Sequence, residues 1–185
     1  MTIDLQTEQR DATDAWESMG LDASTVELVA WSSSLTDCFE DEANRIATAC
    51  GDRLSMIEHV GSTSVPGLES RPIIDLLVGF EHIRDASECI EPLKEIGYRC
   101  HGENGVPGRR HFTRSIDRRC VVQLHMVQFD GEFWVNTIRF RDQLRSDSGL
   151  ADEYALAKKE LQERLATEPA AYEEARAAFE RSALA

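Results

Sequence analysis

The apolar residues of this chain recur with two different periods, which divide it into expected strands and helices. Five segments have the alternating or densely apolar pattern of strands: residues 26–31, 54–60, 72–80, 111–116 and 120–127. Residues 37–50 and 85–96 instead carry apolar side chains at the spacing of an amphipathic helix. Residues 117–119 are the expected hairpin turn between the last two strands.

From residue 132 onward the pattern is helical, with an apolar stripe in the middle of the tail and a last helix after Thr167. Strands separated by helices favour a sheet covered by helices. We therefore predict the α/β (α+β) class, with a mixed sheet flanked by helices and a C-terminal helical segment. The expected divisions are an acidic N-terminal arm at 1–25, with a short helix at 11–19, an α/β core at 26–130, and a helical segment at 131–185 packed on that core.

The charge balance narrows the classes of partner. The 185 residues have a formal net charge of −14, which argues against nucleic acid and fits a small-molecule substrate better than a polymer. No apolar run is long enough to span a membrane, and the first residues lack the pattern of a signal peptide. The five cysteines show no CxxC spacing. We interpret them as reduced thiols and expect a cytoplasmic protein.

One carboxylate stands inside an apolar strand. Asp75 is preceded by two isoleucines and followed by two leucines and a valine. Buried carboxylates are rare unless they are paired, hydrogen-bonded or metal-bound. About a dozen residues earlier, the turn Gly61, Ser62, Thr63 and Ser64 ends another apolar run and offers backbone N–H groups to an anion. The pattern indicates a phosphate cradle beside a metal-binding carboxylate. A strand-end Asp that caps a backbone group, and a plain turn, are the alternatives.

Other polar residues on the strands are candidates for the same site. Gln123 and His125 are two residues apart, so they share one face of their strand. His125 is either part of a metal or phosphate site or a hydrogen-bonded core histidine. Glu58 and His59 point to opposite faces of a strand, so only one of them can face a shared site.

A basic cluster stands out against this acidic background. Residues 99–119 contain six arginines and only two acids. Within the cluster, a Gly- and Pro-containing loop ends in Arg109 and Arg110, whose guanidinium groups suit phosphate or carboxylate oxygens. The alternative is a solvated hairpin. Lys158 lies on an expected exposed helix face and reaches the site only if the tail folds over it.

Several of these residues form motifs that resemble those of the GrpB-like family, a group within the nucleotidyltransferase-fold superfamily. The matching motifs are EHVGSTSVPGL at 58–68, PIID at 72–75, GRRHF at 108–112, LH at 124–125, FRD and LR within 140–145, and Tyr154 with Lys158. The resemblance extends from about Val26 to about Phe179, and its first motif is long and specific.

The resemblance implies a Gly-Ser turn that binds a nucleoside triphosphate, and carboxylates of an Asp-x-Asp strand and a neighbouring strand that hold two Mg²⁺ ions. Gly61, Ser62 and Asp75 match this pattern, but Leu77 occupies the position of the second acid. The expected nucleotide-binding residues are Gly61, Ser62, Thr63, Ser64, Arg109, Arg110 and Lys158. The expected metal ligands are Asp75, Glu58 and Gln123, and the expected catalytic residues are Asp75, His125 and Glu58.

Three functions are compatible with this pattern. The first is a nucleotidyltransferase-like enzyme that uses ATP or another nucleoside triphosphate with Mg²⁺ to nucleotidylate or activate a small molecule. The second is an adenylate-forming ligase that joins a small carboxylate to an amine. The third is a catalytically degenerate domain that binds an anion or a partner, and Leu77 favours it because leucine cannot hold Mg²⁺.

Overall fold

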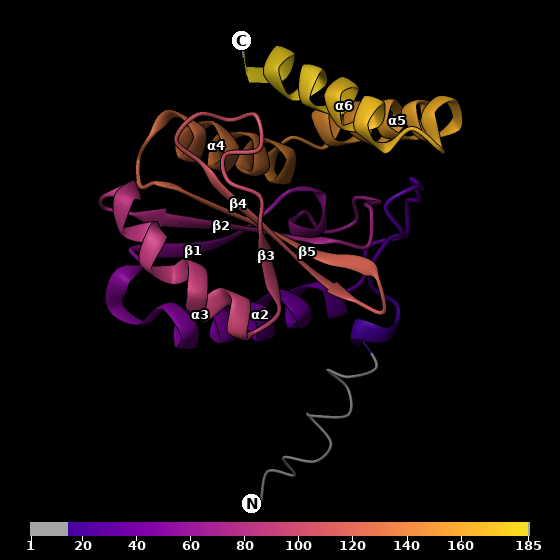
Figure 1. Ribbon diagram of the computed structural model, residues 1–185. Coiled ribbons are helices and arrows are strands. Elements are labelled where there is room, and N and C mark those ends of the chain that lie inside the picture. The colour runs from indigo at the N-terminus through magenta and orange to yellow at the C-terminus, as the bar shows by residue number, and fades with distance from the viewer. Residues whose placement is uncertain (1–14, 185) are drawn as a thin grey trace, which may run out of the picture.

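The computed structural model describes residues 15–184 and shows a five-stranded mixed sheet (Figure 1). The strands are β1 (Met56–Val60), β2 (Ile74–Phe80), β3 (Tyr98–Cys100), β4 (Arg110–Ile116) and β5 (Arg119–Gln128). Their order is β1-β2-β5-β4-β3, and only the central β2–β5 pair is parallel. The predicted α/β class with a mixed sheet is confirmed.

Helices cover both faces of the sheet. The helices α2 (Ser34–Cys50) and α3 (Ile90–Glu95) lie on one face, and α4 (Glu132–Ser146), α5 (Ser148–Leu165) and α6 (Pro169–Leu184) lie on the other side (Figure 1). The predicted C-terminal helical segment is therefore present as three consecutive helices. Of the predicted acidic arm, residues 1–14 lie outside the described residues, and residues 15–17 are helical.

Two of the predicted elements differ from the structure. Residues 26–31 do not form a strand, because their backbone groups bond to separate segments: Val26 N–H to the Ala166 carbonyl and Val29 to Ser70. The predicted helix at 85–96 is a 3-10 helix over Ile83–Cys89 and becomes α-helical only at Ile90. Pro92 explains this boundary, since proline has no N–H to extend a helix backward but is tolerated in the first turn.

The sheet separates two apolar layers. Ile74, Leu76 and Val78 of β2 face the main core under α2 and α3, and all three are fully buried. Leu77 faces the other way and packs with Val60, Val127 and Trp134. Because side chains alternate along a strand, Asp75 shares the face of Leu77. The face that carries Asp75 is therefore the one toward the C-terminal helices.

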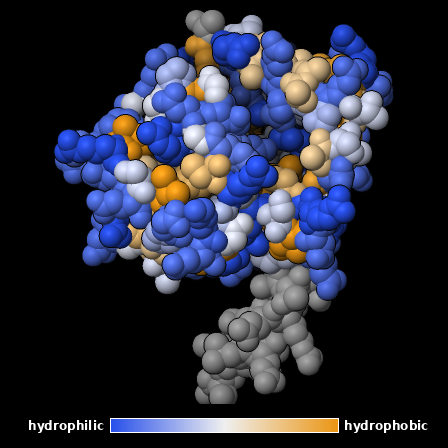
Figure 2. Space-filling model, in the orientation of Figure 1, coloured by the Kyte–Doolittle hydropathy of each residue, from blue (hydrophilic) through white to orange (hydrophobic). Residues whose placement is uncertain are grey.

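The surface turned toward the viewer in Figure 2 is mostly hydrophilic, with hydrophobic residues in small separate areas. Among the described residues, no helix is long and apolar enough to cross a membrane.

Candidate functional site

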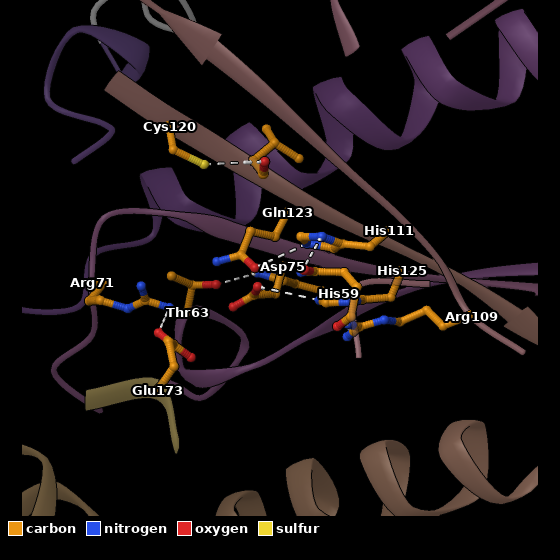
Figure 3. A network of polar contacts seen from close by, with 12 residues as sticks. His59, Thr63, Arg71, Asp75, Arg109, His111, Cys120, Gln123, His125 and Glu173 are labelled. Atoms are coloured by element: carbon orange, nitrogen blue, oxygen red, sulfur yellow. Dashed lines mark hydrogen bonds and ion pairs between the residues drawn. The ribbon is translucent and has the colours of Figure 1, made fainter. Parts of the chain in front are cut away.

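A row of polar side chains crosses the face of the sheet next to Asp75. The register places Asp75 of β2 opposite Gln123 of β5, and Gln123 opposite Thr113 of β4. One step along, His125 stands opposite His111, and their rings are stacked with centroids 5.1 Å apart. The predicted neighbours Asp75, Gln123 and His125 are thus brought together, as Figure 3 shows.

Asp75 lies between a glycine and a histidine. Its Oδ1 is 3.8 Å from His125 Nε2. Its Oδ2 packs so closely on Gly61, which has φ +69°, that a Cβ at position 61 would clash with the carboxylate. Burial acts to raise the pKa of Asp75, but hydrogen bonding and charge from His125, with Arg71 and Arg176, leave that pKa below its usual value. Asp75 is therefore an ionised acceptor held against the Gly-Ser turn.

A small cavity of about 20 Å³ opens beside this carboxylate, and that volume holds about one water molecule. Its wall joins the Gly-Ser turn and β2 to α5 and α6. The lining residues are Ser62, Thr63, Ser70, Arg71, Ile73, Asp75, Lys158, Tyr172 and Arg176. The C-terminal helices thus form the cover of the site.

The side chain of Lys158, on the covering helix α5, extends into this cavity. Its side chain is buried, and its Nζ lies 3.1 Å from Ser62 Oγ and also donates to the Glu69 carbonyl oxygen. Burial and the positive charge of Arg176 lower the pKa of Lys158 to about 7. The expectation of an exposed helix face was wrong for Lys158, because the tail does fold over the Gly-Ser turn.

The sequence analysis missed four residues of the cavity wall: Ser70, Arg71, Tyr172 and Arg176. Arg71 forms an ion pair with Glu173 at 2.5 Å, and Arg176 contacts Glu173 and Glu180. Only Arg71 had a local indication, since it directly precedes the PIID motif.

The buried hydroxyl of Ser70 has no hydrogen-bond partner among the described residues. Ser70 is 1% exposed and lines the cavity. A buried donor without a partner costs free energy, so this oxygen favours a bound water or ligand group in the cavity.

Of the two predicted loop arginines, the structure brings only Arg109 to the row. Arg109 is 8% exposed, and its Nη1 donates to His125 Nδ1 at 3.2 Å. Its guanidinium also lies over Phe133, 5.6 Å from the ring centroid. Arg110 instead donates to the carbonyl of Arg109 and lies 3.8 Å from Glu103. Arg109 thus fixes His125, while Arg110 stays at the rim of the loop.

His111 closes the row on the far side from Asp75. Asn104 donates to its Nδ1 at 3.0 Å, and its Nε2 donates to the Gln123 Oε1 at 3.3 Å. Burial, with the nearby charges of His125 and Arg109, lowers the pKa of His111 to about 4. His111 is therefore neutral near pH 7, and its hydrogen bond engages the side-chain oxygen of Gln123.

The structure does not bring Glu58 into the cavity. Its Oε2 lies 2.6 Å from Arg141 Nη1, and it lines a separate groove of about 910 Å³ between α2, β1, α4 and α5. His59 faces α2, where its ring stacks on Phe39 with centroids 4.5 Å apart and its Nε2 lies 3.0 Å from Thr63 Oγ1. Ser64 also lines the groove, and its hydroxyl donates to the Gly61 carbonyl.

The side chains around Asp75 do not fit a resident Mg²⁺ ion. Leu77 is fully buried in an apolar cluster, Glu58 is paired with Arg141, and the Gln123 oxygen accepts from His111. In the described part of the chain, no three His, Cys, Asp or Glu side chains are grouped so that they could hold a metal ion. A single carboxylate remains, whereas Mg²⁺ prefers six oxygen ligands.

The fold is that of a mixed α/β domain with a Gly-Ser turn and a strand carboxylate under a helical cover. A family model described as GrpB protein matches residues 25–185, so the chain belongs to the GrpB family. The glutamate-rich protein GrpB of Alkalihalophilus pseudofirmus is 32% identical over 158 residues, which cover 83% of this chain and 91% of the relative. The resemblance expected from the motifs is confirmed.

Two further comparisons differ in their coverage. The UPF0157 protein YqkA of Bacillus subtilis is 35% identical over 136 residues, covering 74% of this chain and only 39% of the relative's length. The crystal structure of the conserved protein GrpB from Enterococcus faecalis matches with a TM-score of 0.77 at 29% identity, covering 85% of this chain and 97% of that one.

A more distant structural match is Cid1 in complex with its short product ApU. The TM-score is 0.46 at 12% identity, and the match covers 88% of this chain and 48% of that one. This similarity is too remote to transfer an activity or a ligand.

Proposed function

We propose that this chain binds a nucleoside triphosphate, ATP or another, by its phosphates at the cavity beside Asp75, and transfers a nucleotidyl group to a small-molecule acceptor. One observation carries this proposal. Three basic side chains from separate segments, Arg71, Lys158 and Arg176, meet at the Gly-Ser turn around a buried hydroxyl that has no partner among the described residues. Such an arrangement favours an anion with several oxygens.

A triphosphate is larger than the present cavity, which has room for about one water molecule. Binding therefore requires the side chains of α6, Tyr172 and Arg176, to move away from the turn. The ion pair between Arg71 and Glu173 is the contact that this movement breaks, and it frees the Arg71 guanidinium for a phosphate. The carboxylates on α6 thus occupy the cations until the anion arrives.

Asp75 has the chemistry to orient the acceptor. Its lowered pKa keeps it ionised near neutral pH, so it accepts a hydrogen bond from an attacking hydroxyl or amine. Arg109 holds Nδ1 of His125, which leaves Nε2 to face the Asp75 carboxylate. In this proposal His125 positions the carboxylate and does not itself take a proton from the acceptor.

Calorimetric titration with ATP and with inorganic tripolyphosphate, each with and without Mg²⁺, tests the binding step. We expect saturable binding by wild type and at least tenfold weaker binding by Lys158→Met, because a buried amine that donates hydrogen bonds to the phosphates in either protonation state is removed. Lys159→Ala is the matched control, since Lys159 is the next residue and its side chain is 53% exposed. The absence of saturable binding in wild type would show that the cavity is not a phosphate site.

A second candidate is a domain that binds the nucleotide without catalysis, and the buried Leu77 at the position of the second acid favours it. Release of pyrophosphate from ATP distinguishes the two candidates. The transferase is supported if wild type releases pyrophosphate and Asp75→Asn binds ATP without releasing it. Binding without release under any metal condition supports the binding domain.

A further inference from the structure

Ser62 and Lys158 form a closer pair than phosphate binding alone requires. The two residues are 96 positions apart in the chain, yet Lys158 Nζ lies 3.1 Å from Ser62 Oγ. Lys158 is only 2% exposed. A hydroxyl within hydrogen-bond reach of a buried amine is the arrangement that activates a serine nucleophile.

The surroundings of Lys158 favour its neutral form. Its charge is set by burial and by the groups packed around it, with Arg176 and Arg71 disfavouring a further cation and Glu69 and Glu180 favouring it. The face of the Tyr154 ring, 4.8 Å away, and the Glu69 carbonyl oxygen also stabilise the ammonium. Since the resulting pKa is about 7, a large fraction of Lys158 is an uncharged amine at neutral pH.

A neutral amine satisfies both hydrogen bonds of this site. It has two N–H groups and one lone pair, so it can donate to the Glu69 carbonyl while it accepts from the Ser62 hydroxyl. A protonated Lys158 can only donate, and Ser62 then keeps its proton. The state of Lys158 thus decides whether Ser62 is activated.

We propose that Ser62 and Lys158 are a nucleophile and its general base, and that Ser62 carries the nucleotidyl group as a covalent intermediate. The proposal rests on the proposed function, because the nucleoside triphosphate is the electrophile. Ser62 Oγ attacks the α-phosphorus, and its proton passes to Lys158 Nζ. The new Oγ–P bond forms as the bond from the α-phosphorus to the bridging oxygen breaks, and pyrophosphate leaves with that electron pair.

The second half of the reaction regenerates the enzyme. The acceptor's hydroxyl or amine attacks the same phosphorus, and its proton is taken up by the Asp75 carboxylate, which then releases it to solvent. The Oγ–P bond breaks, and Ser62 Oγ regains its proton from Lys158. Arg71 lines the same cavity, and once it is freed from Glu173 it faces the charge that develops on the phosphoryl oxygens.

Intact-protein mass spectrometry of the full chain after incubation with ATP, without an acceptor, tests this step. Exchange of labelled pyrophosphate into ATP is the second readout. We expect one nucleotidyl group on wild type and on the control Lys159→Ala, mapped to Ser62 by peptide analysis. Ser62→Ala should lose both the adduct and the exchange. Lys158→Met should slow adduct formation by about a hundredfold or more and remove its rise with pH near 7.

Lys158→Arg keeps a cation for the phosphates but cannot act as a base near neutral pH. It should therefore bind ATP and form no adduct, and a cooperative thermal transition shows that it is folded. If wild type binds ATP by calorimetry without adduct or exchange, the covalent step is wrong and the proposed function stands. If ATP does not bind, both are wrong. A phosphoryl adduct, or an adduct on another residue, also contradicts the proposal.

Discussion

Two buried polar clusters lie on opposite faces of the same sheet, and they differ in how fully their groups are paired. On the α2 face, Glu42 is fully buried and accepts two hydrogen bonds from Arg114 at 3.0 and 2.7 Å and one from Tyr98 at 2.7 Å. The ring of Trp16 covers the Arg114 guanidinium at 4.7 Å. On the other face, the cluster of Asp75 and Lys158 surrounds a cavity.

The two clusters differ in whether their buried polar groups have hydrogen-bond partners. The Glu42 cluster pairs its carboxylate with a guanidinium in a two-bonded geometry that fixes α2 on the sheet. The Asp75 cluster contains a lysine with a depressed pKa and a serine hydroxyl that no residue within 15–184 pairs with. Complete pairing is typical of a structural network, whereas incomplete pairing around a cavity is typical of a binding site. The following experiments test this contrast.

The largest expected effect is on the structural side. Glu42→Ala leaves the buried Arg114 without its carboxylate, so it should lower the free energy of unfolding by about 3–5 kcal/mol. Urea denaturation measures this loss. Glu91→Ala is the control, because Glu91 and its partner Lys94 are both largely exposed, and it should cost at most about 1 kcal/mol. Similar losses in the two variants would remove the distinction drawn for Glu42.

The next effect concerns the contact between Gly61 and Asp75. Gly61→Ala adds a Cβ that clashes with the Asp75 carboxylate at a φ of +69°, and it should cost about 1–3 kcal/mol of stability and reduce ATP affinity at least tenfold. Gly67→Ala has a comparable φ of +82° but an open space around its Cβ. It should cost about 1–2 kcal/mol from the backbone alone. Equal ATP affinity in both variants would contradict the close fit of Asp75 on the turn.

The third effect is a dependence of stability on pH. The pKa of Lys158 is lowered from 10.5 in the unfolded reference to about 7 in the folded protein. Between these values the unfolded state binds a proton that the folded state lacks, so stability rises with pH. From pH 8 to pH 9, the unfolding free energy of wild type relative to Lys158→Met should increase by about 1.4 kcal/mol. Parallel curves for wild type and Lys158→Met would show that Lys158 stays charged in the folded protein. Lys159→Met is the control, and its curve should run parallel to that of wild type.

The smallest effect separates the two loop arginines. Arg110→Ala should change the unfolding free energy by less than about 0.5 kcal/mol, because its side chain lies at the rim of the loop. Arg109→Ala removes the donor to His125 and the contact with Phe133, and should cost about 1–2 kcal/mol. Thermal unfolding compares them directly. Equal losses would mean that the loop acts as a unit and that Arg109 has no special role in holding His125.

Much of the fold followed from local patterns. The strands around the Gly-Ser turn and Asp75 were predicted within two residues of β1 and β2, because dense apolar runs between turn residues are local features. The predicted helix at 37–50 appears as α2, which begins three residues earlier. Residues 26–31 were wrongly predicted as a strand, since alternation does not show whether a neighbouring strand exists to pair with them.

The candidate site was only partly predictable for a related reason. Gly61, Ser62 and Asp75 lie close in sequence, so contact between the turn and the carboxylate could be expected. The structure adds the reason for the glycine, because Gly61 has a positive φ and the Asp75 carboxylate packs directly against it. Glu58 could not be placed, because its partner Arg141 is 83 residues away on α4. Side-chain periodicity defines the face of an element but not the element that packs against it.

The sequence by itself determined the elements, the acidic balance, and the turn and strand that carry Ser62 and Asp75, because each depends on neighbouring residues. Only the tertiary structure decided that α5 and α6 fold back over that turn. This packing buries Lys158 beside Ser62 and brings Arg71 and Arg176 to the cavity. The packing of β1, β5 and α4 around β2 encloses Leu77 in an apolar cluster. The charge state of a buried lysine depends on its surroundings in space, and those surroundings come from segments about a hundred residues away along the chain.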